Sequence, residues 1–187
     1  MTSWFDDKIK KQLKESWQTI TESYKDEKSD SFCYMLYVLP EDEGQFTKMQ
    51  KDLDLKGELT ESGKFHITVR YVKDDNYQPL IDHLKGLELP VLKGKCKGFE
   101  LFGKEKDALV IEMEGDELHN WFNKINDWLV ENGFPKSDFP DYKPHITLTY
   151  DKGIEKPEWK KEYEKEVTFK LHVVTGSDYN EVFRLRV

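Results

Sequence analysis

Two stretches decide the fold: Phe65–Tyr71 reads FHITVRY, and Pro144–Tyr150 reads PHITLTY. Both carry His-Ile-Thr followed by an aliphatic residue, a variable residue and a tyrosine. β-Branched and aromatic residues fill them, and neither contains an internal glycine or proline, which is typical of β-strands. The chain therefore contains one strand motif twice.

Side chains of a strand alternate between its two faces, so each motif predicts one apolar face and one polar face. A histidine and a threonine two residues apart share the polar face, and the apolar face suits a core. The expected polar faces are His66, Thr68 and Arg70, and His145, Thr147 and Thr149. The expected apolar faces are Ile67, Val69 and Tyr71, and Ile146, Leu148 and Tyr150.

Composition indicates one folded domain with a short appendage. The chain has 187 residues, of which 37% are hydrophobic and 35% charged, but 13% are aromatic and can supply a core. The formal net charge of −8 disfavours a duplex DNA or RNA binder, which needs basic residues to neutralise phosphates. A small anionic ligand in a local basic pocket stays compatible with that charge.

Cysteine usage and hydropathy predict a cytoplasmic protein that does not enter membranes. Cys33 and Cys96 are far apart in the sequence and form no CxxC motif, so both are expected to be reduced packing residues. No apolar run is long enough for a transmembrane helix, and the N-terminus lacks the apolar core of a signal peptide.

The chain divides into an N-terminal helical extension, 1–30, and a domain, 31–187. Residues 4–25 carry apolar side chains at helical spacing, and we expect this helix to pack on the domain or to mediate an oligomer contact. Residues 40–44, which begin with a proline and end with a glycine, are expected to end the first strand. The predicted strands are 31–39, 65–72, 90–102, 108–113, 144–150, 166–175 and 181–187. The predicted helices are 45–53, 76–87 with Asn76 as its cap, 116–132 stopped by Gly133, and a helical turn within 155–164.

Each motif strand follows a strand–helix unit, which suggests two similar α+β lobes with one motif on each. We expect such lobes to place the polar faces of both motif strands across a shared groove. Two histidines facing one ligand suit general acid–base catalysis, since imidazole titrates near neutral pH. Thr68 and Thr147 could each donate a hydroxyl to a phosphate oxygen, and Arg70 could add positive charge. This arrangement needs no metal and no cofactor.

Other interpretations of these residues stay open at this point. A single His-x-Thr in a strand is common and usually structural, but two copies in similar hydrophobic frames favour a functional site. A zinc site would need a third ligand, and no His-x-x-x-His or Cys/His cluster provides one. The remaining histidines, His83, His119 and His172, are expected to be structural or exposed.

The paired motifs resemble those of the 2H phosphoesterase superfamily, whose members carry two His-x-Thr/Ser motifs on pseudo-symmetric lobes. The resemblance implies a two-lobed α+β fold of the LigT-like type, with antiparallel sheets around a central cleft and here an added N-terminal helix. It also implies metal-independent cleavage of phosphodiesters or cyclic phosphates. His66 and His145 would act as base and acid, and Thr68 and Thr147 would bind phosphate.

Phe139–Tyr150 (FPDYKPHITLTY) and Asp178–Val182 more closely resemble the phage anti-CBASS phosphodiesterases. That resemblance implies a cyclic oligonucleotide substrate, 2′-hydroxyl attack on a 3′–5′ phosphodiester, and a phage protein acting in the host cytoplasm. It implies substrate-binding roles for Glu181, Tyr37 and Phe102. The structural alternatives are a core position for Tyr37, a hairpin flank for Phe102 and a solvated edge charge for Glu181.

Three other functions are compatible with the sequence. The same fold could act on RNA ends or on other cyclic nucleotide phosphates, such as ADP-ribose 1″,2″-cyclic phosphate. It could also bind a cyclic nucleotide without cleaving it. As a third alternative, the domain could be the scaffold of a virion or interaction protein, with the N-terminal helix as its contact.

Overall fold

The computed structural model describes residues 32–38, 40–72, 74, 76–87, 91–103, 105–137, 141–175 and 181–184. The expected helix 4–25 and the extension 1–30 lie outside these residues. Within them the chain alternates strands and helices in the predicted order, including both motif strands and both hairpins. The expected α+β fold class is confirmed.

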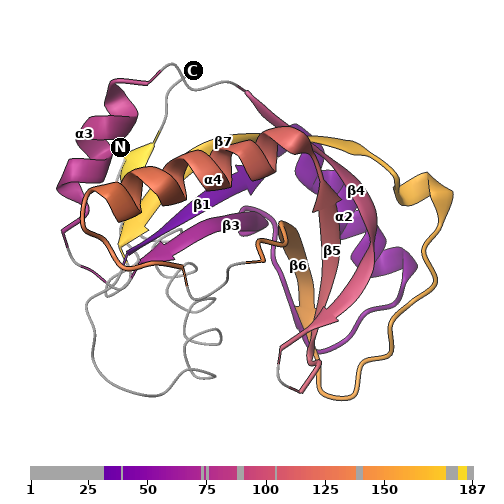
Figure 1. The fold of residues 1–187 in the computed structure, drawn as a ribbon. Coiled ribbons are helices and arrows are strands. Elements are labelled where there is room, and N and C mark those ends of the chain that lie inside the picture. The colour runs from indigo at the N-terminus through magenta and orange to yellow at the C-terminus, as the bar shows by residue number, and fades with distance from the viewer. Residues whose placement is uncertain are drawn as a thin grey trace, which may run out of the picture.

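The described strands form one antiparallel sheet in the order β2-β6-β5-β4-β7-β1-β3, and β8 pairs with β7. The sheet curls strongly, so that β3 and β6, near its opposite ends, come into contact (Figure 1). The two lobes meet where β4 pairs with the start of β7. The bounds are β1 Phe32–Val38, β2 Glu58–Leu59, β3 His66–Val72, β4 Leu92–Phe102, β5 Ala108–Glu114, β6 His145–Tyr150, β7 Glu166–Thr175 and β8 Glu181–Arg184.

Three α-helices and one 3₁₀ turn accompany the sheet in the described part of the chain. They are α2 Pro40–Asp52, α3 Gln78–Lys85, α4 Asp116–Glu131 and η1 Lys161–Tyr163. Helix α4 runs along both lobes in front of the sheet (Figure 1). None of the described helices has the length and apolar character needed to cross a membrane.

Two predicted helix starts are wrong. Strand β1 ends before Pro40 as predicted, but Pro40 itself begins α2, ahead of the predicted start at 45. Proline has no amide hydrogen to lose in the first turn, and its fixed φ suits a helix. Gly44 is then accommodated inside α2 on its exposed side. Helix α3 begins at Gln78, two residues after Asn76, with Tyr77 in place of Asn76 as N-cap, and the Tyr77 side chain makes no capping hydrogen bond.

The predicted stop of α4 at Gly133 is confirmed. Gly133 has a φ of +86°, a conformation that glycine adopts without steric cost. The amides of Gly133 and Phe134 donate to the carbonyls of Val130 and Leu129, at 3.2 and 2.9 Å. This pair of bonds is the Schellman motif, and it directs the chain into the loop that leads back to the second motif strand.

Both motif strands contain a β-bulge at the same position. In β3, Arg70 pairs with Tyr34 and Thr68 pairs with Met35, so Val69 is the extra residue. In β6, Thr149 pairs with Leu109 and Thr147 pairs with Val110, so Leu148 is extra. A bulge sets two residues opposite one and shifts the alternation of faces. Burial follows this shift: the fourth and fifth motif residues are buried in succession, and the sixth, a tyrosine, is half-buried.

Helix α2 holds the segments that lead into both motif strands. The Gln50 side-chain Nε2 donates to the carbonyls of Thr60 and Leu148, both at 2.8 Å. The Glu43 carboxylate, 8% exposed, accepts bonds from the Ser62 hydroxyl and the Gly63 amide at 2.8 Å. Phe46 packs against Phe65, directly before the first motif histidine, with ring centroids 5.3 Å apart. One helix therefore fixes the entry to β3 and the bulge of β6.

We predict that Gln50→Leu lowers the free energy of unfolding by about 2 kcal/mol. The substitution keeps side-chain volume but removes both donated bonds, of which the one to the Leu148 carbonyl is buried and the one to the Thr60 carbonyl is half-buried. Urea unfolding followed by circular dichroism measures the effect. Lys51→Leu, on the exposed side of the same helix, is the control. Equal midpoints for the two variants would contradict the role given to Gln50.

Candidate active site

The two motif histidines are held in the same way. The Nδ1 atom of His66 lies 2.8 Å from the carbonyl oxygen of Lys64, and that of His145 lies 2.8 Å from the carbonyl oxygen of Lys143. A carbonyl only accepts, so Nδ1 carries the hydrogen in each ring. In the neutral rings Nε2 is then the unprotonated nitrogen, able to take a proton, and in the imidazolium it can give one.

The two rings come from β3 and β6, strands that contact each other, and they are close enough to interact electrostatically. Burial lowers the pKa of both histidines, and the bonds to the Lys64 and Lys143 carbonyls partly offset this. The charge of His145 lowers the pKa of His66 further, while the Glu112 carboxylate raises the pKa of His145. The predicted approach of the two motif faces therefore holds for their histidines, and double protonation of the pair is disfavoured.

The bulges add tyrosines to the polar faces, so the predicted core positions of Tyr71 and Tyr150 are wrong. Tyr150 lies on the same face as His145 and Thr147, and its phenol shares a hydrogen bond with the Thr147 hydroxyl. Burial raises the pKa of Tyr150, so the phenol stays neutral at physiological pH. Tyr71 takes the corresponding position beside Thr68. The sequence indicated a role for these tyrosines because both motifs end in one. Only the register with the neighbouring strands shows that they lie on the polar faces.

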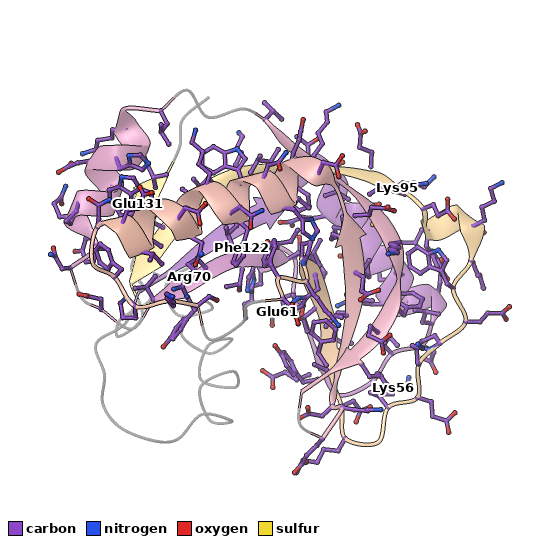
Figure 2. The ribbon with its side chains drawn as sticks, viewed as in Figure 1. Lys56, Glu61, Arg70, Lys95, Phe122 and Glu131 are labelled. Carbon is purple, nitrogen blue, oxygen red and sulfur yellow. The ribbon has the colours of Figure 1, made fainter. Side chains whose placement is uncertain are left out.

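The same bulges remove Arg70 and Thr149 from the polar faces, so these two predicted positions are also wrong. The Arg70 guanidinium is only 4% exposed and donates to the carbonyls of Tyr71 and Pro135, at 2.7 and 2.6 Å. Figure 2 shows Arg70 beside the loop that follows α4, away from β6. Thr149 is fully buried and donates to the Lys56 carbonyl at 2.6 Å. Both side chains therefore anchor loops to the motif strands.

Phe102 lies at the site. Its ring centroid is 4.5 Å from that of His145, with the planes tilted by 55°. The loop before β6 is fixed on the other side by Tyr142, which stacks on Phe122 of α4 with centroids 4.2 Å apart. Aromatic contacts therefore restrict both the second histidine and the segment that carries it.

The backbone positions of Tyr37 and Glu181 are described. Tyr37 on β1 is the register partner of His66, which places it next to the first histidine. Glu181 begins β8 and pairs with Val174, so β7 and β1 separate it from β3. Their substrate-binding roles remain predictions.

The remaining polar clusters of the described residues do not resemble a metal site. Within those ranges no three His, Cys, Asp or Glu side chains converge on one point. The site is thus a set of two imidazoles, two hydroxyls and nearby aromatic rings, which can move protons and hold an anion.

Comparisons with known proteins agree with this geometry. The family model described as anti-CBASS protein Acb1 matches residues 33–185. Escherichia coli LigT complexed with 3′-AMP has a similar fold, with a TM-score of 0.63, 15% identity and coverage of 84% of this chain and 98% of LigT. A protein described as a phosphoesterase gives a TM-score of 0.63 at 15% identity, covering 83% and 97% of the two chains. The Thermus thermophilus protein TT0787 gives 0.57 at 16%, covering 77% and 87%.

We predict that His145→Gln raises the pKa of His66. The substitution removes the neighbouring positive charge that disfavours a second proton, so His66 accepts a proton at higher pH. NMR titration of the His66 ring in the full chain measures the change. His83→Gln, on α3, provides the control. An unchanged or lower His66 pKa in His145→Gln would contradict the proximity of the rings.

Proposed function

Because the chain belongs to the anti-CBASS protein Acb1 family, we propose that it is a metal-independent phosphodiesterase that hydrolyses cyclic oligonucleotide signals. The family and the LigT-like fold support a phosphodiesterase of the cyclic-phosphate type. One observation carries the finer proposal: two histidines on facing strands have Nδ1 bound to carbonyls, so both have Nε2 for proton transfer.

The chemistry follows from two imidazoles that hold one proton between them. The neutral histidine takes the proton of a ribose 2′-hydroxyl as its oxygen attacks the adjacent phosphorus. The protonated histidine gives its proton to the departing 5′-oxygen, so a P–O2′ bond forms and the P–O5′ bond breaks. The product is a linear chain ending in a 2′,3′-cyclic phosphate, which water can open by the reverse proton transfers.

The threonines bind the non-bridging oxygens in this mechanism. Thr68 and Thr147 lie two residues from the histidines on the same strand faces. The Tyr150 phenol orients the Thr147 hydroxyl. A hydroxyl fixed in advance loses little conformational entropy when the phosphorane forms, which favours the transition state.

Two observations favour a small cyclic oligonucleotide over a long RNA. The net charge of −8 opposes the binding of a long polyanion, whereas one phosphate needs only local donors. Phe102 beside His145 offers an aromatic face on which a nucleobase can stack. The binding of 3′-AMP by the similarly folded LigT is compatible with a nucleotide substrate here.

We predict that the full chain cleaves 3′,3′-cyclic GMP-AMP in the presence of EDTA, and that His66→Ala and His145→Ala each lose about 10²–10⁴-fold in rate. Each variant removes one of the two proton transfers. Chromatography of the products measures cleavage and identifies a terminal cyclic phosphate or its opened form. Lys97→Ala, an exposed position of β4, is the control.

The outcomes separate the alternatives. Loss of wild-type activity in EDTA, or full activity in either histidine variant, would overturn the mechanism. Cleavage of linear oligonucleotides with 2′,3′-cyclic phosphate ends, but not of cyclic dinucleotides, would indicate an enzyme for RNA ends. Tight calorimetric binding of the cyclic dinucleotide without product over hours would indicate a binding protein that sequesters it.

We further predict that Tyr150→Phe lowers kcat/KM by about 3–10-fold, since one neutral hydrogen bond contributes about 1 kcal/mol. The Thr147 hydroxyl keeps its place but loses the partner that orients it. Steady-state kinetics on the same cyclic dinucleotide tests this. The comparison is Tyr163→Phe, which removes a phenol oxygen from the aromatic cluster of Phe99 and Trp159. Equal kinetics for the two variants would contradict an orienting role for Tyr150.

A further inference from the structure

The two histidines sit in similar frames but have different cross-strand neighbours. Across β5, His145 pairs with Glu112, and Glu112 in turn pairs with Gly98 on β4. Across β1, His66 pairs with Tyr37, and Tyr37 in turn pairs with Lys170 on β7. The direct cross-strand neighbour of His145 is therefore an anion, Glu112. The direct neighbour of His66 is Tyr37, and a cation, Lys170, follows on the next strand.

Geometry places the Glu112 carboxylate on the same face as the His145 ring. Directly opposed residues of antiparallel strands project to one face, with Cβ atoms about 4.5–5.5 Å apart. Glu112 is half-buried between Ile111 and Met113, which are both buried in the core on the other face. Phe102 lies against the ring. The Phe102 ring takes the place of water beside His145, so the Glu112 charge is screened less from the imidazole than it would be in solvent.

Glu112 acts on His145 through its charge. The His145 Nδ1 hydrogen is donated to Lys143, and Nε2 is left for the substrate. The carboxylate raises the pKa of His145 against the effect of burial. Repulsion between the two imidazolium rings is mutual, so it disfavours a second proton without selecting a ring. The charge of Glu112, directly across the strand pair, therefore favours His145 as the ring that holds a single proton.

Other charged or titratable groups of the described residues reinforce this difference or leave it unchanged. Lys64 precedes His66 and pairs with Glu61 at 3.2 Å, so its charge is largely compensated. Lys170 lies two strands from His66, beyond Tyr37, so β1 separates its charge from the ring. Near His145, Lys143 is exposed and screened by solvent. Tyr71 and Tyr150 lie on the motif faces, and burial raises the pKa of Tyr150, so its phenol is neutral.

We propose that Glu112 is a positioning residue that makes His145 the general acid and leaves His66 as the general base. This inference rests on the proposed phosphodiesterase function. In the first step the 2′-hydroxyl proton goes to Nε2 of His66, the P–O2′ bond forms, and the P–O5′ bond breaks. The proton on Nε2 of His145 goes to the 5′-oxygen. Water attack on the cyclic phosphate would use the two rings in exchanged roles.

The first test is the pH dependence of kcat/KM for cyclic dinucleotide cleavage by Glu112→Gln. The basic limb of the profile reports the group that must be protonated, which is His145 in this proposal. Without the Glu112 charge this limb should move to lower pH, so that kcat/KM above pH 7 falls by about 2–10-fold. The acidic limb should move less. Glu112→Asp should restore most of the profile. Glu114→Gln removes the same charge two residues along the same strand and is the matched control. An identical profile for Glu112→Gln and Glu114→Gln would overturn the proposal.

The second test uses adenosine 3′-(4-nitrophenyl phosphate), whose leaving group departs without a proton. The variant that lacks the general acid should keep its rate on this substrate to within about tenfold, whereas the variant that lacks the base should lose about 10²–10⁴-fold. We expect His145→Ala to behave as the former and His66→Ala as the latter. The opposite pattern, or equal losses in both, would overturn the assignment.

The two proposals can fail separately. If the wild type releases nitrophenol but does not cleave cyclic dinucleotides, the proposed substrate is wrong, and the histidine variants still decide the roles on the nitrophenyl ester. If the wild type cleaves cyclic dinucleotides but the histidine variants reverse, only the assignment is wrong. A wild type inactive on both substrates would overturn both.

Discussion

The paired β-bulges at Val69 and Leu148 are the constraint on which the site depends. A regular strand would set His, Thr and the fifth motif residue in one row and would bury the tyrosine. The extra residue instead ends the polar row after the threonine and brings the tyrosine back to that face. Arg70 and Thr149 are turned into the protein, where their polar groups bind loop carbonyls. Each strand thus presents a compact set of imidazole, hydroxyl and phenol.

A bulge leaves backbone groups that the sheet does not pair, and α2 supplies part of the compensation. The Leu148 carbonyl accepts from both Gln50 and the Thr60 amide, at 2.8 and 2.9 Å. Through Glu43 the same helix holds the loop before β3. Buried backbone groups without partners are costly, so these bonds stabilise the segments that they hold beside the two motif strands. The spacing of the two histidines is consequently coupled to one helix that contacts both lobes.

Much of the fold follows from local sequence pattern, and the errors within the two motif strands have a common cause. The two strands, the hairpins and the end of α4 at Gly133 depend on residue types and spacings that act within a few residues. The pairing of His and Thr on one face was also predictable, because it precedes the bulge. Arg70, Tyr71, Thr149 and Tyr150 lie beyond it, and their faces depend on the register with β1 and β5. That register is a property of strands distant in sequence, as is the placement of Glu112 beside His145.

The scaffold repeats one unit, but proton transfer in opposite directions requires two unlike histidines. The backbone makes the same hydrogen bond to both rings, since each Nδ1 atom binds the carbonyl of the residue two positions earlier. A difference must then come from outside the repeated motif. The strand pairing provides it, because β5 sets a carboxylate against His145, whereas β1 sets Tyr37 against His66. A duplicated fold can in this way keep the geometry of its motifs and acquire an acid and a base by substitution on the neighbouring strands alone.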